Sequence, residues 1–599
     1  MFHRFFFCLC LAAAFISCKQ DKADTAVADG LVSPQGVVYK HNDNAVRIAL
    51  RAEPTTLNPL LAVDASTRYV REMIFQTLNS RDPETLESVP LLASVPDVEK
   101  EASGGVAYSF LIDEAAKWPN GMPVTAADVI FSLKVVLNPL VDAGQYRPYY
   151  EMVSGVVTSP NNERRVRIQT KRPYLLAEES LASLPVYPEY AYDPEGLLRG
   201  VSLATLTNPT AAQRLAEKGG PLKAFADRFN DPATGRDADK IVGSGPYQLT
   251  NWEDGQRVTL TKREDYWAAD RSDPWLAAGP DEIVFNIIAD NATMVNALRD
   301  EAVDVVVSMS VDQFKEVRDD EYLNERYEFE TVQSLAYFGL LYNMNNPLFR
   351  DAKTRRALAH LTDVDAMIEQ LLPGLAARVS GPVLPGKSYY NNDLKLIDYD
   401  PGKAAALLAE AGWSDTNGDG TLDKEINGTR EEFRFDFMTP ASPTSIAIAT
   451  LFKDWLRDAG IDMNVSQQDR RAMGGALAKG NFAMAILGQG FNPTPDEFTQ
   501  VWASTSVPPN GSNRSGFNNA EADRLIKEIK VTLDAKDRDP LYRRFQEIIY
   551  EEQPMIFLFS PLDRVVVSKR FEYAPKSTSP NLNFNDLTRK KWNRVKKGS

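Results

Sequence analysis

The segment 116–134 constrains the fold most, because it places a turn and the start of a helix to within a residue. Residues 119–121 read Pro-Asn-Gly, in which proline fixes φ while asparagine and glycine tolerate positive φ. Thr125 occupies an N-cap position, and Asp128 three residues later supplies the acidic half of a capping box. Apolar residues then recur at helical spacing, namely Val129, Ile130, Leu133 and Val136. We therefore expect a capped helix that begins after Thr125.

Strand and helix patterns alternate along the rest of the chain, which indicates an α/β protein. Alternation of Tyr108, Phe110 and Ile112 with small or polar residues predicts a half-buried strand just before the turn. Similar patterns predict strands at 46–50, 164–170, 258–262, 283–288, 337–344, 433–438, 461–465 and 551–560. Helices are predicted at 72–78, 211–218, 292–298, 400–413 and 446–459. A chain of 599 residues is too long for one hydrophobic core, so we expect two or more domains.

Particular residues of the first segment resemble a known signature. They are Lys117-Trp118, Gly121, Thr125-Ala126 and Asp128-Val129. This pattern is similar to the most recognisable motif of the family 5 extracellular solute-binding proteins, the dipeptide- and oligopeptide-binding components of ABC importers. Further stretches resemble the family in the same order along the chain: 54–59, 90–93, 184–188, 242–247, 265–267, 297–304, 343–358, 400–413 and 551–560. The resemblance covers about residues 46–568. One departure is that Ala302 stands where we expect the family's glycine.

The resemblance implies a two-lobed periplasmic-binding-protein fold of type II, with the extra subdomain of the peptide-binding class and a ligand cleft between the lobes. It implies a non-catalytic, monomeric protein without cofactor that captures peptides by hinge closure and delivers them to a membrane permease. The expected divisions are 1–17 as signal peptide, 18–40 as flexible tether, 41–330 as lobe I, 331–555 as lobe II and 556–599 as the return to lobe I. Within lobe I, we expect a subdomain at about 81–205 and an insertion at 194–240.

The N-terminus has the features of a lipoprotein signal. His3 and Arg4 form a basic end, residues 5–15 are apolar but too few to span a bilayer, and residues 15–18 (Phe-Ile-Ser-Cys) resemble a lipobox. The chain's 3 cysteines are Cys8, Cys10 and Cys18, so cleavage before Cys18 leaves one cysteine and no internal disulfide. We expect export and anchoring through a lipid on Cys18, at the periplasmic face or cell surface. A plain secretory signal with a chance cysteine is the alternative.

Net charge and motif content argue against nucleic-acid binding and phosphate binding. A net charge of −15 argues against nucleic acid as a partner. Residues 381–388 match the P-loop pattern G-x-x-x-x-G-K-S, but Pro382 and Pro385 each remove an N–H from the phosphate cradle and a poor helix sequence follows. We interpret this match as a coincidence. Gly243 and Gly245 are expected to permit a tight turn rather than to bind phosphate, because no helix N-terminus follows them.

Residues 415–420 begin like a calcium loop, but Ile426 stands where an EF-hand needs a bidentate acid. A solvated β-turn is the favoured interpretation, with calcium left open; we assign no metal ligand. Motifs for a zinc protease or a serine nucleophile elbow are absent from the sequence. His360, on a predicted helix, is expected to be a surface or hydrogen-bonded residue.

The resemblance assigns ligand-binding residues to two stretches. The loop at 53–59 borders the family's cleft, which makes Thr55 and Leu57 candidates. The stretch 487–498 corresponds to the segment in which peptide binders offer an aspartate to the ligand's amino group, and its candidates are Gly488, Gln489, Gly490, Phe491 and Asn492. Here Gly488 takes the family's tryptophan position, and Phe491 takes the aspartate position.

That replacement weakens the case for a peptide, since a buried ammonium is costly to hold without an opposite charge. Asn492 offers one hydrogen bond, and a shift in register would bring Asp496 closer. A peptide is the expected ligand; a sugar, a metal chelate or another small solute is the competitor. A surface lipoprotein enzyme, and a sensor or scaffold without a permease, are the remaining alternatives.

Overall fold

The computed structural model describes residues 30–62, 64–82, 87–307, 309–490, 495–573 and 584–594. The predicted signal peptide and Cys18 therefore lie outside the described residues. The described residues form two compact units: one within Asn44–Lys590, and a small one whose described parts are 30–43 and 591–594. In the small unit, β1 (Leu31–Val32) pairs antiparallel with β2 (Val38–Tyr39) and with β25 (Asn593–Arg594). The stretch 18–40, expected as a tether, thus contains two short strands.

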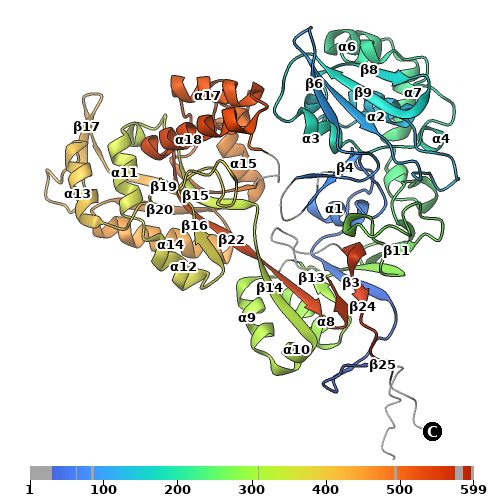
Figure 1. Cartoon of the computed structure of the whole chain (residues 1–599). Helices are drawn as coiled ribbons and strands as arrows, with labels where there is room; N and C mark the ends of the chain where they lie inside the picture. Colours follow the sequence, from blue (N-terminus) through green and yellow to red (C-terminus); the bar gives the residue numbers. More distant parts are fainter. Residues whose placement is uncertain are drawn as a thin grey trace, which may run out of the picture. The chain divides into compact units, whose positions relative to one another are not determined.

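Helices and strands alternate through the larger unit, which confirms the α/β class (Figure 1). Its described α-helices are α1 (Ala65–Arg71), α2 (Ala126–Leu137), α3 (Ala177–Ala182), α4 (Glu189–Tyr192), α5 (Leu203–Leu206), α6 (Pro209–Glu217), α7 (Pro221–Phe229), α8 (Asn291–Arg299), α9 (Val311–Asp319), α10 (Glu321–Arg326), α11 (Ala352–His360), α12 (Val364–Leu371), α13 (Pro401–Glu410), α14 (Pro443–Asp458), α15 (Arg470–Lys479), α16 (Thr499–Trp502), α17 (Ala520–Val531) and α18 (Ala535–Glu552). Among the described residues, none of these helices is long and apolar enough to cross a membrane.

Twelve described strands form one large mixed sheet. Its main path runs β10 (Tyr247–Glu253), β11 (Arg257–Lys262), β12 (Glu282–Ile287), β3 (Ala45–Leu50), β13 (Val305–Val306), β22 (Met555–Ser568), β15 (Ala336–Tyr342), β21 (Met484–Gly490), β19 (Arg434–Pro440) and β20 (Asp462–Gln468), while β14 (Tyr327–Gln333) and β16 (Ala376–Arg378) also pair with β22. Parallel pairs are β12 with β3, β3 with β13, β19 with β20 and β19 with β21.

Strand β22 joins the two halves of this sheet (Figure 1). Its first part pairs with β15 and β16, and its later part pairs with β14 and β13. The sequence predicted a strand at 551–560, whereas residues 551–552 end α18 and the strand runs from Met555 to Ser568. Its length follows from its burial, since apolar residues at both ends pack in the interior. One long strand thus contributes to both halves.

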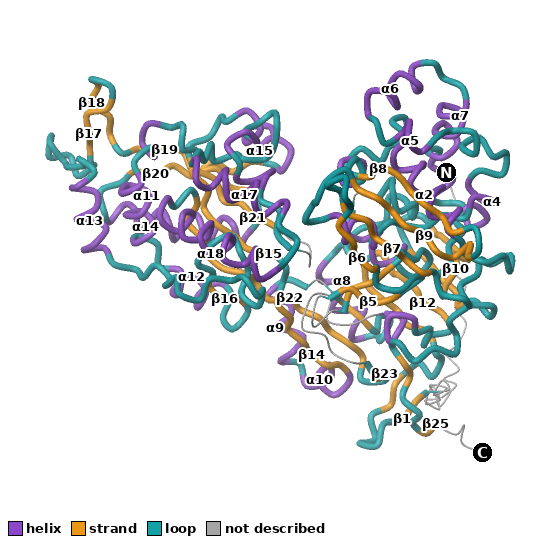
Figure 2. The backbone as a smooth tube through the Cα atoms, turned by 45° about the horizontal axis from the view of Figure 1, so that its top comes forward, coloured by secondary structure: helices purple, strands orange, loops and turns teal. Residues whose placement is uncertain are grey.

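Smaller sheets complete the larger unit. A four-stranded antiparallel sheet has the order β6 (Asp97–Lys100), β7 (Val106–Leu111), β9 (Asn162–Thr170) and β8 (Val153–Ser159). Two-stranded pairs are β4 (Asn79–Arg81) with β5 (Ser88–Pro90), β17 (Asp423–Ile426) with β18 (Thr429–Glu432), and β23 (Phe571–Glu572) with β24 (Thr588–Arg589). Figure 2 shows α5, α6 and α7 grouped together near β8 and α2. Since α6 covers Pro209–Glu217, the helix predicted at 211–218 is confirmed.

The predicted capping box at the start of α2 is present. Asp128 accepts a hydrogen bond from the backbone N–H of Thr125 at 2.9 Å. Val129, Leu133 and Val136 are fully buried on the helix's inner face. Local sequence therefore specified both the first residue and the buried face of this helix.

Two further local predictions differ from the structure in detail. The helix predicted at 72–78 lies earlier, at Ala65–Arg71, because Asp64 caps it by accepting a hydrogen bond from the Thr67 N–H at 2.7 Å. Gly243 and Gly245 were expected to permit a tight turn; the chain bends at 244–246, but neither glycine has a positive φ, and a Cβ on Gly243 would lie 2.0 Å from the Ile74 carbonyl oxygen. These glycines allow the backbone to approach residues 73–74, which the Gly245 N–H contacts through a 2.8 Å hydrogen bond to Ile74.

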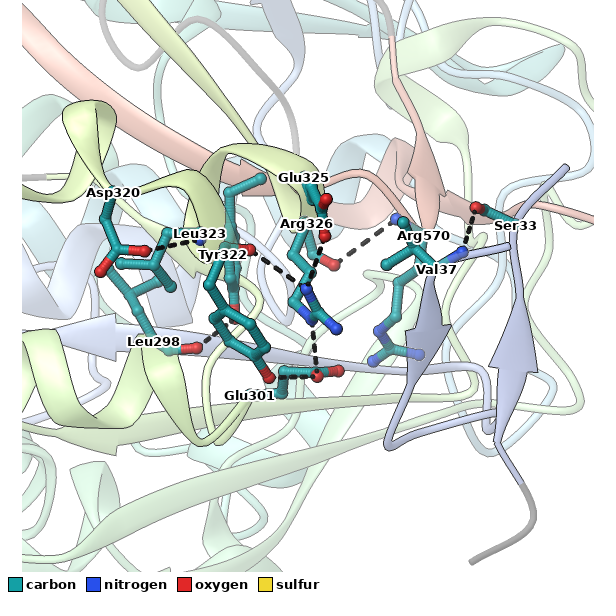
Figure 3. Close-up of polar contacts among 12 residues, drawn as sticks. Ser33, Val37, Leu298, Glu301, Asp320, Tyr322, Leu323, Glu325, Arg326 and Arg570 are labelled. Carbon is teal, nitrogen blue, oxygen red and sulfur yellow. Dashed lines mark hydrogen bonds and ion pairs between the residues drawn. The ribbon is translucent and has the colours of Figure 1, made fainter. Parts of the chain in front are cut away.

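The position that favours glycine near 302 is Glu301, not Ala302. Glu301 has a φ of 55°, a left-handed conformation that L-residues adopt at a cost. Figure 3 shows its carboxylate facing Arg326 and Tyr322 of α10. Arg326 Nε lies 3.3 Å from Glu301 Oε1, and the Tyr322 hydroxyl lies 3.4 Å from the same oxygen. This pairing compensates for the backbone conformation.

Three hydrophobic clusters form the interior. Cluster 1 includes residues of β3, of β7, β8 and β9 in the four-stranded sheet, and of the helices up to α7. Cluster 2 includes residues of α8, α11 and α14 and one face of β15, and cluster 3 includes residues of α17 and α18 and the other face of β15. In cluster 1, the stacked rings of Phe225 and Phe229 from α7 pack against Phe131 and Tyr187. The helices of the expected 194–240 insertion are therefore anchored in the core.

Candidate functional site

The first candidate stretch is the loop at 53–59, which follows β3. The Thr55 hydroxyl donates to Asp64 Oδ2 at 2.6 Å, so this exposed residue is tied to the residue that caps α1. The Leu57 side chain is fully buried, and its backbone N–H donates to the Gly235 carbonyl at 2.7 Å. Leu57 thus anchors the loop in the core, and Thr55 is the exposed one of the two candidates.

Residues at the end of the expected insertion brace this loop. Arg236 Nη2 lies 3.1 Å from Glu53 Oε1, and the Arg236 guanidinium stacks over the Trp252 ring at 4.1 Å. The Trp252 indole N–H donates to the same Glu53 oxygen at 2.7 Å. Gly235 is required at the contact, because a Cβ there would lie 1.7 Å from the Thr56 hydroxyl. The insertion therefore supports the loop that carries Thr55.

Glu53 is held as a carboxylate by these contacts. Partial burial acts to raise its pKa, but hydrogen bonds from Trp252, from the Gly255 backbone and from Arg236, together with the Arg236 charge, lower the pKa below its ordinary value. The loop therefore begins at an ionised side chain with fixed partners.

The second candidate stretch is the end of β21. Gly488, Gln489 and Gly490 pair antiparallel with residues 336–338 of β15, and the strand ends at Gly490. A Cβ on Gly488 would lie 3.0 Å from the ring of Phe338, so a large side chain at this position would require the ring to move. Phe491 and Asn492, the other two candidates, lie outside the described residues.

A buried polar cluster fixes the chain at Asp496, shortly after the second candidate stretch in the sequence. Lys387 Nζ lies 2.6 Å from Asp496 Oδ1, and the Tyr389 hydroxyl donates to Asp496 Oδ2 at 3.1 Å. The Tyr542 hydroxyl donates to the Asp496 carbonyl, and its ring stacks on Tyr389 at 4.0 Å. Burial raises the pKa of Asp496, and the Lys387 ammonium opposes this rise. Asp496 is therefore committed to an internal ion pair.

The two candidate stretches belong to different parts of the interior. Leu57 is a member of cluster 1, whereas Leu487 packs against cluster 3. Among the described residues, no hydrogen bond or ion pair joins residues 53–59 to residues 488–490. Each stretch is thus positioned by its own surroundings.

Sequence reasoning missed two residues with positioning roles. Lys387 was recognised only as part of a P-loop match, and Arg236 only as part of a polar insertion. No helix follows 381–388 before α13, so the cradle that a P-loop requires is not formed there. Pro382 and Pro385, which lack the N–H groups that a phosphate cradle needs, argued against a P-loop from the sequence. Nothing in the sequence spacing indicated that Lys387 pairs with Asp496.

Three features of the described residues bear on metal binding and acid–base chemistry: possible metal-ligand groups, the turn at 415–420 and His360. No group of three or more His, Cys, Asp or Glu in that part is arranged to hold a metal ion. In the 415–420 turn, Asp415 accepts from the backbone N–H groups of Gly418 and Gly420. His360 is buried, with Nδ1 2.8 Å from the Asp398 carbonyl, and burial lowers its pKa.

Comparison with known proteins decides the family. The model of the family described as "Bacterial extracellular solute-binding proteins, family 5 Middle" matches residues 87–511. The chain belongs to this family. The family resemblance inferred from the signature motif at 117–129 is thereby confirmed.

Two curated relatives illustrate the range of this solute-binding family. The chain is 27% identical over 541 residues to the oligopeptide-binding protein AppA of Bacillus subtilis (strain 168), covering 88% of this chain and 89% of AppA. It is 23% identical over 529 residues to heme-binding protein A of Haemophilus influenzae, covering 84% of each chain.

Solved structures agree with the fold of this family 5 protein. AppA from Bacillus subtilis in complex with a nonapeptide has a TM-score of 0.66 and 25% identity, covering 91% of this chain and 99% of AppA. NikZ from Campylobacter jejuni in complex with Ni(L-His) has a TM-score of 0.68 and 20% identity, covering 90% and 97%. The expected two-lobed periplasmic-binding-protein fold is confirmed, and the family is one of extracellular solute-binding proteins rather than of enzymes.

Proposed function

We propose that this family 5 solute-binding protein captures peptides and delivers them to the permease of an ABC importer. The observation that carries the proposal is the likeness to AppA, whose solved complex holds a nonapeptide and which this chain matches over nearly the whole of both proteins. Relatives described as dipeptide-binding proteins, from Bacillus subtilis and Escherichia coli, support the same class of ligand.

Capture would proceed by closure of two lobes on the ligand, with binding shifting the population from open to closed. Many modest contacts in a closed cleft can reach the ~8 kcal/mol of a micromolar complex. We propose 41–330 and 556–599 as lobe I and 331–555 as lobe II. Thr55, Leu57 and residues 488–492 are the proposed ligand-binding positions, and the braces at Arg236 and Lys387 would hold them in place.

We further propose that the protein is a monomeric lipoprotein anchored through Cys18, exposed at the periplasmic face or cell surface. Support comes from the lipobox-like residues 15–18 and from the absence of other cysteines after Cys18. We propose no catalytic activity, because the sequence contains no recognised nucleophile or metalloenzyme motif and the family binds solutes. Turnover of a substrate by the pure protein would contradict this proposal.

A non-peptide solute is the second candidate. It is favoured by Phe491, which stands at the position of the amine-binding aspartate, and by the relatives described as binding heme and Ni(L-His). Asp496 cannot replace that aspartate without giving up its ion pair with Lys387. We place the peptide first because AppA shares more of its sequence with this chain than those two relatives do.

A thermal-shift screen separates the two candidates. A ligand that binds only the folded protein raises the melting temperature by mass action. We expect a shift with a peptide library and none with panels of sugars, heme and metal chelates at equal concentration. A shift with a non-peptide solute alone would replace the peptide by that solute and leave the transport role in place.

A further inference from the structure

A cavity of about 260 Å³ adjoins the second candidate stretch. Its walls come from β15, β21, β22, α16 and the loop at 512–515, and they include Tyr337, Leu487, Gln489, Gln500, Trp502 and Arg514. Whole-ligand sites commonly measure about 300–1,000 Å³. The cavity is therefore suited to one end or one side chain of a ligand rather than to an entire peptide.

Arg514 gives this cavity its charge. Its side chain is partly buried, and within the described part of the chain its guanidinium has no hydrogen-bond or ion-pair partner. Other buried arginines behave differently: Arg355 pairs with Glu552, and Arg570 pairs with Asp304 at 2.7 Å. Arg514 thus presents an unused planar fork of N–H donors to the cavity, a geometry that matches a carboxylate.

Neighbouring carboxylates do not compete for this cation. None of the residues that line the cavity is Asp or Glu. On the segments that flank α16, Asp496 pairs with Lys387, Glu497 accepts from Thr499, and Asp523 accepts from Ser504. The local electrostatic preference is therefore for an anion supplied from outside.

The remaining lining residues suit a carboxylate carried on an apolar stem. Gln489 and Gln500 line the cavity, and the side-chain amide of each has two N–H donors. One N–H of Gln489 donates to the Gly490 carbonyl at 3.0 Å, which leaves the other for a carboxylate. Leu487, Trp502 and Tyr337 form apolar walls. Gln489 is also one of the proposed ligand-binding residues on β21, so the cavity opens from the stretch already assigned to the ligand.

We propose that this cavity is a carboxylate subsite and that Arg514 is its specificity-determining residue. The inference rests on the proposed function, because the carboxylate belongs to the captured peptide. It comes either from the peptide's C-terminus or from an Asp or Glu side chain. The ligand is thus selected through its negative group at Arg514, in a protein whose expected amine-binding position holds Phe491.

Competition among peptide libraries tests the subsite. The purified protein is mixed with three random pentapeptide libraries: one without Asp or Glu and with a free C-terminus, its C-terminally amidated form, and an amidated form that includes Glu. Retained peptides are quantified by mass spectrometry. We expect a carboxylate-bearing library to be enriched about tenfold or more over the neutral one, the effect of a hydrogen bond to a charged group. Which acidic library is enriched identifies the source of the carboxylate.

Matched variants assign the effect to one side chain. Arg514→Gln should reduce the enrichment to about one, whereas Arg514→Lys, which keeps the charge and loses the fork, should give an intermediate value. Arg471→Gln, at an exposed position on α15, should retain the wild-type ratio. Melting temperatures of the three variants show that each is folded.

The outcomes separate the two proposals. Peptides retained without preference for a carboxylate, or a preference that survives in Arg514→Gln, would overturn the subsite and leave peptide capture intact. Failure of the wild-type protein to retain peptides from any library would overturn the proposed function, and the subsite with it.

Discussion

Lys387 and Asp496 form a buried ion pair, with Nζ and Oδ1 2.6 Å apart and side chains only 7% and 4% exposed. The pair joins residues separated by 109 positions in the sequence. It holds the chain immediately after the stretch assigned to the ligand, and the hydroxyl of Tyr389 completes the coordination of the carboxylate. The lysine of an apparent P-loop is thus a structural cation.

Removing Lys387 should therefore be costly. Lys387→Met leaves the Asp496 carboxylate buried without its counter-charge, and we expect a loss of about 3–5 kcal/mol in the free energy of unfolding. The double variant Lys387→Met/Asp496→Leu should recover much of that loss, because both charges are removed together. Denaturant titration measures these values. Lys479→Met, at an exposed residue that ends α15, should change stability by no more than about 0.5 kcal/mol. A loss below about 1 kcal/mol for Lys387→Met would contradict the assignment.

Arg236 should influence ligand affinity without contacting the ligand. Arg236→Gln removes the ion pair with Glu53 and the stacking on Trp252, and so loosens the loop that carries Thr55. Contacts of this kind contribute about 1 kcal/mol or less each, so we expect the Kd to rise roughly threefold to tenfold. Calorimetric titration with a peptide found in the thermal-shift screen provides the measurement. Arg214→Gln, exposed on α6 of the same insertion, is the matched control; equal Kd values for both variants would refute the bracing role.

The ion pair between Arg236 and Glu53 also predicts that the stability of the protein depends on pH. Because the folded protein lowers the pKa of Glu53, ionised Glu53 contributes stability above its ordinary pKa of about 4.3, and that contribution is lost as the pH falls through the lowered value. Arg236→Gln should raise this pKa and move the loss to higher pH. The difference in unfolding free energy between wild type and Arg236→Gln should therefore be larger at about pH 6 than at about pH 3. A difference that does not change with pH would count against a charged Glu53 in the brace.

Glu301 offers a test of the left-handed position beside α10. Both Glu301→Ala and Glu301→Gly lose the ion pair with Arg326, but only glycine adopts a φ of 55° without a Cβ penalty. We expect Glu301→Gly to be more stable than Glu301→Ala by about 1 kcal/mol, measured by denaturant unfolding. The reverse order would show that the backbone there relaxes in the variants.

The extent to which sequence predicted the structure depended on the range of the interactions. Thr125 and Asp128 are three residues apart, and the helix they cap was predicted to its first residue. Helix α1 was predicted at 72–78 and lies at Ala65–Arg71. Its N-cap, Asp64, is not followed by a clear helical repeat of apolar residues, so the start of the helix was missed. Glu301 was overlooked because the family's glycine position was assigned to Ala302, one residue after the residue with the left-handed φ.

The candidate site was harder to predict than the fold. The family motifs located the stretches around Thr55 and Gly488, but Arg236 and Glu53 are 183 residues apart and Lys387 and Asp496 are 109 apart. Partners at such separations are chosen by tertiary packing, which composition and periodicity do not encode locally. Only the folded chain shows that Asp496 is occupied and that Arg514 faces a cavity.

Peptide capture is the central claim, and calorimetric titration of the purified protein with single synthetic peptides tests it most directly. The account predicts saturable binding of one peptide per protein, with a Kd in the micromolar range or below and no detectable heat from the corresponding free amino acids. Saturable binding of a sugar, heme or metal chelate, with no binding of any peptide, would contradict it.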